Sequence, residues 1–429
     1  MGTLSVFLDV PLAPSTDIPL DAYKADPSSL KVCLGHADTD EVWIPPVVKR
    51  ILLQIPEDPT LNHEYLPELG ILEFTTAAMK LVIGKESRAL LDNRVMAAGI
   101  QTIGGTGAVW TGAEFLHRWY KPSNCTPTTV LLAEHHLENL GCIFQVAGFT
   151  DIRTYRYWNP ERLTVDTVSF LMELQSAPKG SIVFLHAPEE ISLTPKQWKQ
   201  VSTVMAERHL FPFFDVPAQG LASGNLDRDA WAVRHFVDRG FEILCAQSFS
   251  RIFGLYDERI GNLIVVTKNN QTLIKILSQL AKQISVTWLG PTSLGARVIS
   301  MVLTSPALLY EWKQSLKALV KRIMLVREKL KEKLRILGTP GSWEHLTAQS
   351  GVYSFIGLLP SQVEFLAKEK HIYLLSNGQI NICSINAKNL DYVAQSIHEA
   401  IMSTSHQDQS VTVRIYSSPT HVSKSESFY

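Results

Sequence analysis

The sequence predicts an α/β protein, with a large domain built on a mainly parallel mixed sheet flanked by helices and a smaller α+β domain. The chain has 429 residues, more than one average domain, and 45% of them are apolar while 19% are charged, which is enough apolar material for more than one buried core. Short β-branched and aromatic runs alternate with longer amphipathic segments. This alternation is typical of βαβ units, which form parallel sheets.

The expected strands are short apolar runs that end in polar, glycine or proline residues, and they are too short to be helices. Because ligands of such sheets bind beyond the carboxyl ends of the strands, we expect the chemistry in the turns that follow these runs. The strands are expected at 129–132, 181–185, 210–214, 241–245 and 262–266, and the clearest helices between them at 195–208 and 228–238.

A long helical pattern at 306–337 has apolar residues along one side, which predicts a packed helix that carries the chain from one domain to the next. We expect an N-terminal arm and part of the small domain at 1–45, the large domain at 46–318 and the rest of the small domain at 319–402. The tail, 403–429, is rich in Ser, His and Gln with few apolar residues, which indicates disorder.

Charge and cysteine usage exclude several kinds of partner. The net charge is -1 and the basic residues are scattered, so no nucleic acid is expected. The five cysteines form no C-x-x-C pair, which argues against disulfides and against a metal site and favours a reducing compartment. With no secretory signal and no apolar run long enough to span a bilayer, we expect a cytoplasmic protein without a membrane partner.

The most specific segment lies at 246–262 and reads AQSFSRIFGLYDERIGN. Class I pyridoxal-phosphate-dependent aminotransferases, the aspartate aminotransferases above all, carry AQSFSKNFGLYNERVGN at this turn, and the chain resembles that family at most of these positions. The resemblance extends from about residue 5 to 402, and its start resembles the cytosolic branch. Further matching segments are SVF at 5–7, NHEYLP at 62–67, GGTGA at 104–108, FPFFD at 211–215 and KNLDY at 388–392.

The resemblance implies a class I aminotransferase fold and a pyridoxal phosphate site. A phosphate requires backbone N–H groups at a helix start, hydroxyl donors and a bidentate cation. Gly105 and Thr106 match the family's helix entry, Ser248 its hydroxyl donor and Arg259 its phosphate-pairing guanidinium. Asp215 matches the aspartate that keeps the pyridine nitrogen protonated, which makes the ring an electron sink.

Two further positions bear on assembly and on covalent chemistry. Tyr65 matches the tyrosine that reaches the phosphate from the other subunit, so the resemblance implies a homodimer. At the position of the family's Schiff-base lysine the chain has Arg251. A guanidinium is a poor nucleophile and a poor base because it stays protonated and its lone pairs are delocalised. No catalytic residue of the family is therefore intact.

Groups that hold the substrate in the family are also replaced. The family grips dicarboxylates with two arginines, and here those positions are Ser285 and Gln379. The loop after His186 is shorter and lacks the family's HNPTG sequence, and a loop near residues 35–38 is shortened as well. The remaining replacements are Ala218 for a tyrosine, Leu137 for the tryptophan that stacks on the ring, and Leu140 for the histidine behind the aspartate.

The phosphate groups are thus largely kept, while the groups that grip the substrate or move protons are largely lost. The family reaction converts L-aspartate and 2-oxoglutarate to oxaloacetate and L-glutamate. We predict a protein that is inactive or strongly impaired in this reaction and that binds pyridoxal phosphate without a covalent bond. Two alternatives stay open: an enzyme with residual or altered amino-acid chemistry, and a non-catalytic partner in a mixed dimer with a catalytic relative.

Overall fold

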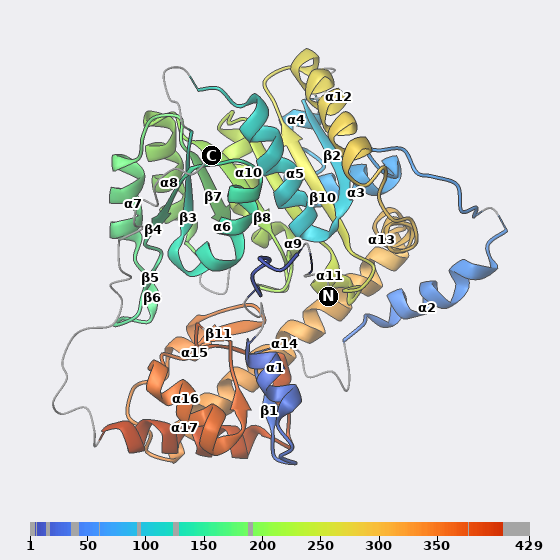
Figure 1. Ribbon diagram of the computed structural model, residues 1–429. Helices are drawn as coiled ribbons and strands as arrows, with labels where there is room; N and C mark the ends of the chain where they lie inside the picture. The colour runs from blue at the N-terminus through green and yellow to red at the C-terminus, as the bar shows by residue number, and fades with distance from the viewer. Residues whose placement is uncertain are drawn as a thin grey trace.

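A computed structural model describes residues 5, 7–13, 18–35, 43–59, 61–91, 96–122, 128–187, 192–375 and 377–405. Its elements lie in two groups, a larger one around a seven-stranded sheet and a smaller one of short strands and helices (Figure 1). The helix α14 (Pro306–Ile336) runs from one group to the other. This is the two-part α/β architecture that the sequence predicts.

The large sheet has the strand order β2-β10-β9-β8-β7-β3-β4. Only β10 runs antiparallel to its neighbours, and the other adjacent pairs are parallel. All five expected runs are strands of this sheet, whereas β2 and β4 were not foreseen. The strands are β2 (Ala97–Ile103), β3 (Thr129–Ala133), β4 (Asp151–Tyr155), β7 (Ile182–His186), β8 (Phe211–Val216), β9 (Ile243–Ser248) and β10 (Ile260–Val266).

Both faces of this sheet are covered, which explains why its strands read as continuous apolar runs. Phe213 enters the core on one face and the adjacent Phe214 the core on the other. The first face is covered by α5 (Gly104–Trp119), α6 (Leu137–Val146) and α12 (Asn270–Thr287). The second is covered by α3 (Leu72–Ile83), α7 (Thr167–Ser176), α8 (Pro195–Glu207) and α10 (Trp231–Asp238).

The helix expected at 306–337 is confirmed as the 31-residue α14. The side chain of Ser305 accepts a hydrogen bond from the backbone N–H of Leu308, and Pro306 begins the helix, so the first turn is capped. A buried stripe then follows the helical period from one group of elements into the other. Its members are Trp312, Leu316, Leu319, Ile323, Leu330 and Leu334.

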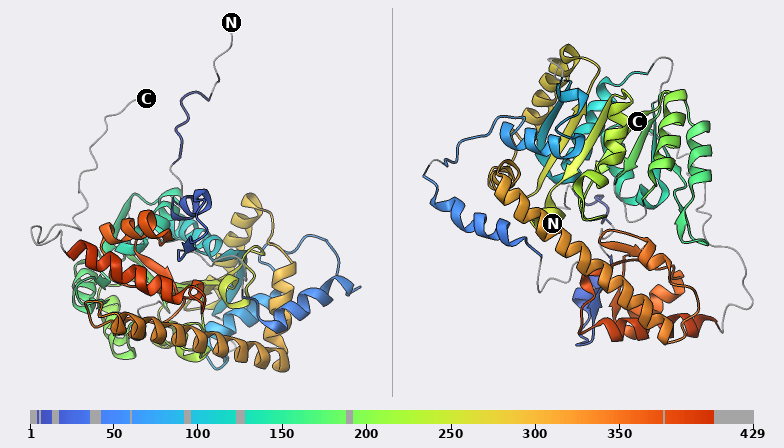
Figure 2. Two further views of the ribbon diagram at one scale, coloured as in Figure 1. Left: turned by 90° about the horizontal axis from the view of Figure 1, so that it is seen from below. Right: turned by 180° about the vertical axis from the view of Figure 1, so that it is seen from behind.

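The smaller group joins the two ends of the described chain. The strand β1 (Val32–Cys33) pairs parallel with β12 (Ile372–Tyr373), and β11 (Tyr353–Phe355) pairs antiparallel with β13 (Gln379–Asn381). Both views in Figure 2 show α14 as one unbroken ribbon reaching this group. Its helices are α1 (Ile18–Ala25), α15 (His345–Ala348), α16 (Pro360–Lys370) and α17 (Leu390–Ser405).

Short elements complete the two groups. They are α2 (Pro46–Gln54), α4 (Arg88–Leu91), β5 (Trp158–Asn159), β6 (Thr164–Val165), α9 (Leu226–Asp229), α11 (Ser250–Phe253) and α13 (Leu294–Thr304). The helix α17 continues to Ser405, past the expected start of the tail at 403, and 406–429 lie outside the described residues. So do Val6, the shortened loop at 36–38, and 188–191 in the loop after His186.

Candidate functional site

Five residues of interest lie in a row along one edge of the large sheet. Gly104 follows β2, Arg259 precedes β10, and Ser248, Asp215 and His186 lie at or near the ends of β9, β8 and β7. The strand register sets them side by side, since Gly261 pairs with Ser248 and His186 pairs with Asp215. This is the carboxyl edge of the parallel strands, where ligands of α/β sheets bind.

At one end of the row, the start of α5 forms a cradle. The backbone N–H of Gly104 donates to the carbonyl oxygen of Arg259 at 2.6 Å, and Gly104 has a left-handed φ of +67°. A Cβ on Gly104 would lie 2.8 Å from Nη2 of Arg259, and one on Gly105 would lie 2.9 Å from Cβ of Ser248. Only glycine permits this approach of helix, hydroxyl and guanidinium.

The cradle has the chemistry of an anion site. The first N–H groups of a 16-residue helix are available at Gly105 and Thr106, where the helix dipole also favours negative charge. The side chains of Ser248 and Arg259 lie beside them. The structure therefore brings together the four residues that the sequence assigned to a phosphate.

Further along the row, Asp215 has a histidine partner that the sequence reasoning missed. Nδ1 of His186 lies 3.2 Å from Oδ2 of Asp215, and both side chains are largely buried, with 7% and 14% exposed. The rings of His136 and His186 pack with centroids 3.8 Å apart. The sequence signal was the position of His186 and Asp215 at the ends of two consecutive parallel strands, whereas the expected position, Leu140, packs against the core beneath the sheet.

Arg251 lies in the short helix α11 and points toward the smaller group of elements. Its guanidinium carbon is 5.1 Å from the centroid of the Tyr353 ring, on β11. Within the described part of the chain, Arg251 forms no ion pair and no hydrogen bond through its side chain. Nothing in the sequence pattern signalled this contact, because it joins residues about a hundred positions apart on different elements.

Two ionisable groups near this guanidinium are neutral, the Tyr256 phenol and the Cys383 thiol. Burial raises the pKa of the Tyr256 phenol and of the Cys383 thiol, and the nearby charge of Arg251 offsets only part of each shift. Both groups therefore stay protonated near neutral pH.

The two positions at which arginines were expected carry no charge. Ser285 is exposed near the end of α12. Gln379 is buried on β13, and its side-chain oxygen accepts a hydrogen bond from Nδ2 of Asn377 at 2.9 Å. Ala218 is in the turn after β8, and Leu137 begins α6 with a 40% exposed side chain. None of these side chains supplies a cation.

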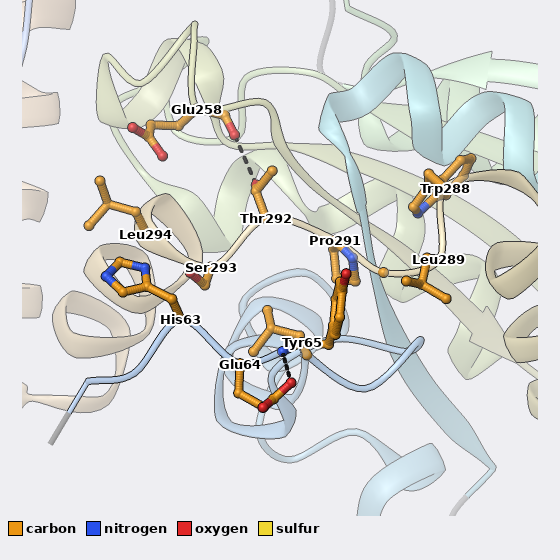
Figure 3. Close-up of a pocket in the computed structure, with 12 residues that line it drawn as sticks. His63, Glu64, Tyr65, Glu258, Trp288, Leu289, Pro291, Thr292, Ser293 and Leu294 are labelled. Carbon is orange, nitrogen blue, oxygen red and sulfur yellow. Dashed lines mark hydrogen bonds between the residues drawn. The ribbon is translucent and has the colours of Figure 1, made fainter.

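Tyr65 lines a pocket to which none of the five residues of the sheet-edge row contributes. Its side chain is 79% exposed and lines a pocket of about 420 Å³ with residues 63–66, 258 and 288–294. Figure 3 shows the tyrosine facing the 288–294 segment, where Thr292 donates a hydrogen bond to the carbonyl oxygen of Glu258. In the described chain no hydrogen bond joins Tyr65 to Ser248 or Arg259.

Neither a metal cluster nor a membrane-spanning helix is present among the described residues. No three His, Cys, Asp or Glu side chains are grouped so that they could hold a metal ion. No described helix has the length and hydropathy to cross a membrane.

The family model for aminotransferase class I and II matches residues 30–397, so the chain belongs to this family. Cytoplasmic aspartate aminotransferase of Gallus gallus is 48% identical over 407 residues, which cover 92% of this chain and 98% of that protein.

Solved structures agree in fold. Cytoplasmic aspartate aminotransferase of Saccharomyces cerevisiae matches with a TM-score of 0.87 at 32% identity, covering 93% of this chain and 99% of that one. Aromatic-amino-acid aminotransferase of Burkholderia pseudomallei, covalently bound to pyridoxal phosphate, matches with a TM-score of 0.86 at 32% identity, covering 93% and 100%.

Proposed function

We propose that this chain is a cytoplasmic, aspartate aminotransferase-like protein that holds pyridoxal phosphate without a covalent bond and is inactive or strongly impaired as a transaminase. The observation that carries the proposal is the contrast at one sheet edge. The anion cradle at the start of α5 and the Asp215–His186 pair are assembled, while the position of the anchoring lysine is an arginine turned toward Tyr353.

The residues present fit the phosphate and the ring of this cofactor. The N–H groups of Gly105 and Thr106, the hydroxyl of Ser248 and the guanidinium of Arg259 would hold the phosphate. Asp215, supported by His186, would hold the proton of the pyridine nitrogen. When bound, pyridoxal phosphate supplies a ring that withdraws electrons from the substrate's α-carbon.

The chain's own residues give little support for the steps of transamination. A guanidinium is a poor base and a poor nucleophile because its lone pairs are delocalised, so Arg251 is not suited to take a proton from a substrate or to attack an aldehyde. Losing a bidentate charged contact costs about 2–5 kcal/mol, and each 1.4 kcal/mol is about tenfold. With Ser285 and Gln379 at both arginine positions, dicarboxylate recognition falls by orders of magnitude.

The test compares cofactor binding with covalent attachment in the purified protein. Pyridoxal phosphate is titrated by absorbance, borohydride is added, and intact mass is measured. We expect saturable binding without a lysyl adduct, and no transfer between aspartate and 2-oxoglutarate. A stoichiometric adduct on one lysine contradicts non-covalent binding, and the absence of saturable binding contradicts the cofactor assignment.

A second candidate function, altered amino-acid chemistry, is favoured by the retained Asp215–His186 pair. A panel of amino acids and keto acids is assayed with the natural chain and with Asp215→Asn. Turnover that exceeds the variant's supports this candidate. Equal background rates in both proteins exclude it.

The proposal includes a homodimer, supported by the exposed Tyr65 beside a pocket in its own chain rather than at its own cradle. The same exposure leaves room for a mixed dimer with a catalytic relative. In such a dimer Tyr65 could serve the relative's phosphate, but Ser285 could not supply an arginine to the relative's substrate. We expect one poor site, so co-purified mixed dimers with full activity per site would contradict this.

A further inference from the structure

Arg251 lies between the two groups of elements, and in the described part of the chain its guanidinium has no carboxylate partner. It extends from α11, at the edge of the large sheet, to the face of Tyr353 on β11 in the smaller group. The side chain is half-buried, and among the described residues no carboxylate lies within ion-pairing distance of it. A positive charge that is partly removed from water favours a nearby anion.

Two hydrogen bonds from α14 hold the segments on either side of this guanidinium. Nε1 of Trp312 donates to the carbonyl oxygen of Ile252, the residue after Arg251, at 2.8 Å. Fifteen residues further along the same helix, Nη2 of Arg327 donates to the carbonyl oxygen of Tyr353 at 2.7 Å. The helix that carries Arg251 and the strand that carries its aromatic partner are therefore both attached to one helix, and the geometry is preorganised.

The described groups near Arg251 supply no free negative charge. Tyr256 and Cys383 are neutral, since burial raises the pKa of each. The carboxylate of Asp215 is engaged with His186. On the β11–β13 sheet, Gln379 pairs with Phe355 and its side-chain oxygen is taken by Asn377, so that sheet offers no negative charge either.

The contact of Arg251 with Tyr353 is made to the tyrosine ring, and among the described residues no hydrogen bond uses the N–H groups of the guanidinium. A cation over an aromatic face is stabilised through the flat side of its partner, while the N–H groups of a guanidinium point outward in its plane. Those N–H groups form a fork that matches the two oxygens of a carboxylate.

We propose that Arg251 is the carboxylate-binding group of this site and that its ligand is a small organic carboxylate, held bidentately beside the ring of Tyr353. The cation that the resemblance led us to expect at position 379, on the β11–β13 sheet, is supplied instead from α11, which faces that sheet. This proposal adds a ligand class to the proposed function. It rests on that function in one respect, namely that Arg251 forms no covalent bond with the cofactor.

The test is isothermal titration of succinate into the full-length protein. We expect saturable binding that weakens at least about tenfold in Arg251→Gln, because a bidentate charged contact is lost. Arg322→Gln is the matched control: it removes the same charge from an exposed arginine of α14 that also acts on Cys383. Its affinity should stay within about twofold of the natural chain's.

Two further measurements distinguish bidentate binding by a guanidinium from simple attraction to a positive charge and from misfolding of the variant. Arg251→Lys keeps the charge without the fork and should bind succinate with intermediate affinity. Succinamide, of similar size but neutral, should not bind. Equal affinity for succinate in the natural chain and in folded Arg251→Gln overturns the proposal, as does equal binding of succinamide or the absence of succinate binding.

Pyridoxal phosphate is titrated by absorbance in the same samples. A protein that binds succinate through Arg251 but does not bind the cofactor contradicts the proposed function alone. A protein that binds the cofactor but not succinate contradicts the Arg251 assignment alone.

Discussion

At residue 251, the difference between a guanidinium and an ammonium decides whether the chain can bond to an aldehyde. We predict that Arg251→Lys forms a borohydride-reducible adduct with pyridoxal phosphate, detectable by intact mass. The same variant should remain about a thousandfold or more below an active relative with aspartate and 2-oxoglutarate, because two bidentate contacts are still missing at Ser285 and Gln379. Substantial aspartate turnover in this single variant would contradict our interpretation of the site.

His186 is a second residue whose role can be measured alone. It lies 3.2 Å from the Asp215 carboxylate, and a hydrogen bond to a charged group contributes about 1.5–3 kcal/mol. We predict that His186→Leu weakens pyridoxal phosphate binding by roughly tenfold or more. The measurement is an absorbance titration, with the urea midpoint recorded to show that the variant is folded. Unchanged affinity would mean that Asp215 needs no support from this histidine.

At the scale of elements, α14 holds the smaller group through one buried guanidinium. Arg327 is fully buried, and it donates hydrogen bonds to five neutral oxygens of the smaller group. These oxygens are the carbonyls of Leu346, Ser350, Gly351 and Tyr353 and the hydroxyl of Ser354.

We predict that Arg327→Met lowers the free energy of unfolding by about 3–5 kcal/mol, since several buried acceptors lose their donor at once. Arg335→Met is the control, because Arg335 is exposed and its ion pair in the described part of the chain is with Glu332 on the same helix. That change should cost no more than about 0.5 kcal/mol. Urea denaturation measures both, and similar losses in the two variants would contradict the assigned role.

The N-terminal segment is attached to the smaller group by a pH-sensitive contact. The backbone N–H of Ser28, the hydroxyl of Tyr373 and His371 lower the pKa of Asp26. Burial and the bond to Asp26 raise the pKa of Tyr373 to about 12. The Asp26 contribution is therefore present above its unfolded pKa, about 3.9, and is lost as pH falls through the lower folded value.

We predict that the stability gap between the natural chain and Asp26→Asn narrows as pH falls from 7 to 3. For Tyr373 the sign is opposite: its contribution is complete below the unfolded pKa, about 10, and is lost as pH rises through about 12. The difference in stability between the natural chain and Tyr373→Phe should therefore narrow in strong alkali. Urea midpoints across pH measure both, and a gap independent of pH would contradict the contact.

The elements show where sequence reasoning works. Continuous apolar runs predicted the five central strands, because both faces of those strands are buried. The strand β2 was missed because Gly99 and Gln101 break its apolar pattern. A Cβ on Gly99 would lie 2.6 Å from the carbonyl oxygen of Thr75, and Nε2 of Gln101 donates to the carbonyl oxygen of Thr292. Both are tertiary requirements with no local sequence signal.

In the candidate site too, some features could be predicted from the sequence and others could not. Gly105, Thr106, Ser248 and Arg259 could be assigned from motifs because each lies in a segment of contiguous matching sequence. The pairing of His186 with Asp215 and the contact of Arg251 with Tyr353 depend on sheet register and on the packing of two groups of elements. Such relations emerge only when the chain is folded.

At the scale of the whole molecule, the proposed homodimer is testable directly. We predict that light scattering after size exclusion gives a mass twice that of one chain. Tyr65→Ala should leave the mass unchanged and weaken pyridoxal phosphate binding, because this exposed side chain would reach the partner's phosphate rather than its own. A monomer that still binds the cofactor with full affinity would contradict this arrangement.

The length of α14 has a mechanical consequence. A helix of 31 residues is a rod about 46 Å long, and a tilt of about 5° at one end moves the other end by about 4 Å. Near one end of this helix, Trp312 donates a hydrogen bond to the residue after Arg251. Further along, Arg327 donates one to the backbone of Tyr353. Because both attachments are to the same helix, a tilt of α14 would move Arg251 and Tyr353 together, and the distance between them would change little.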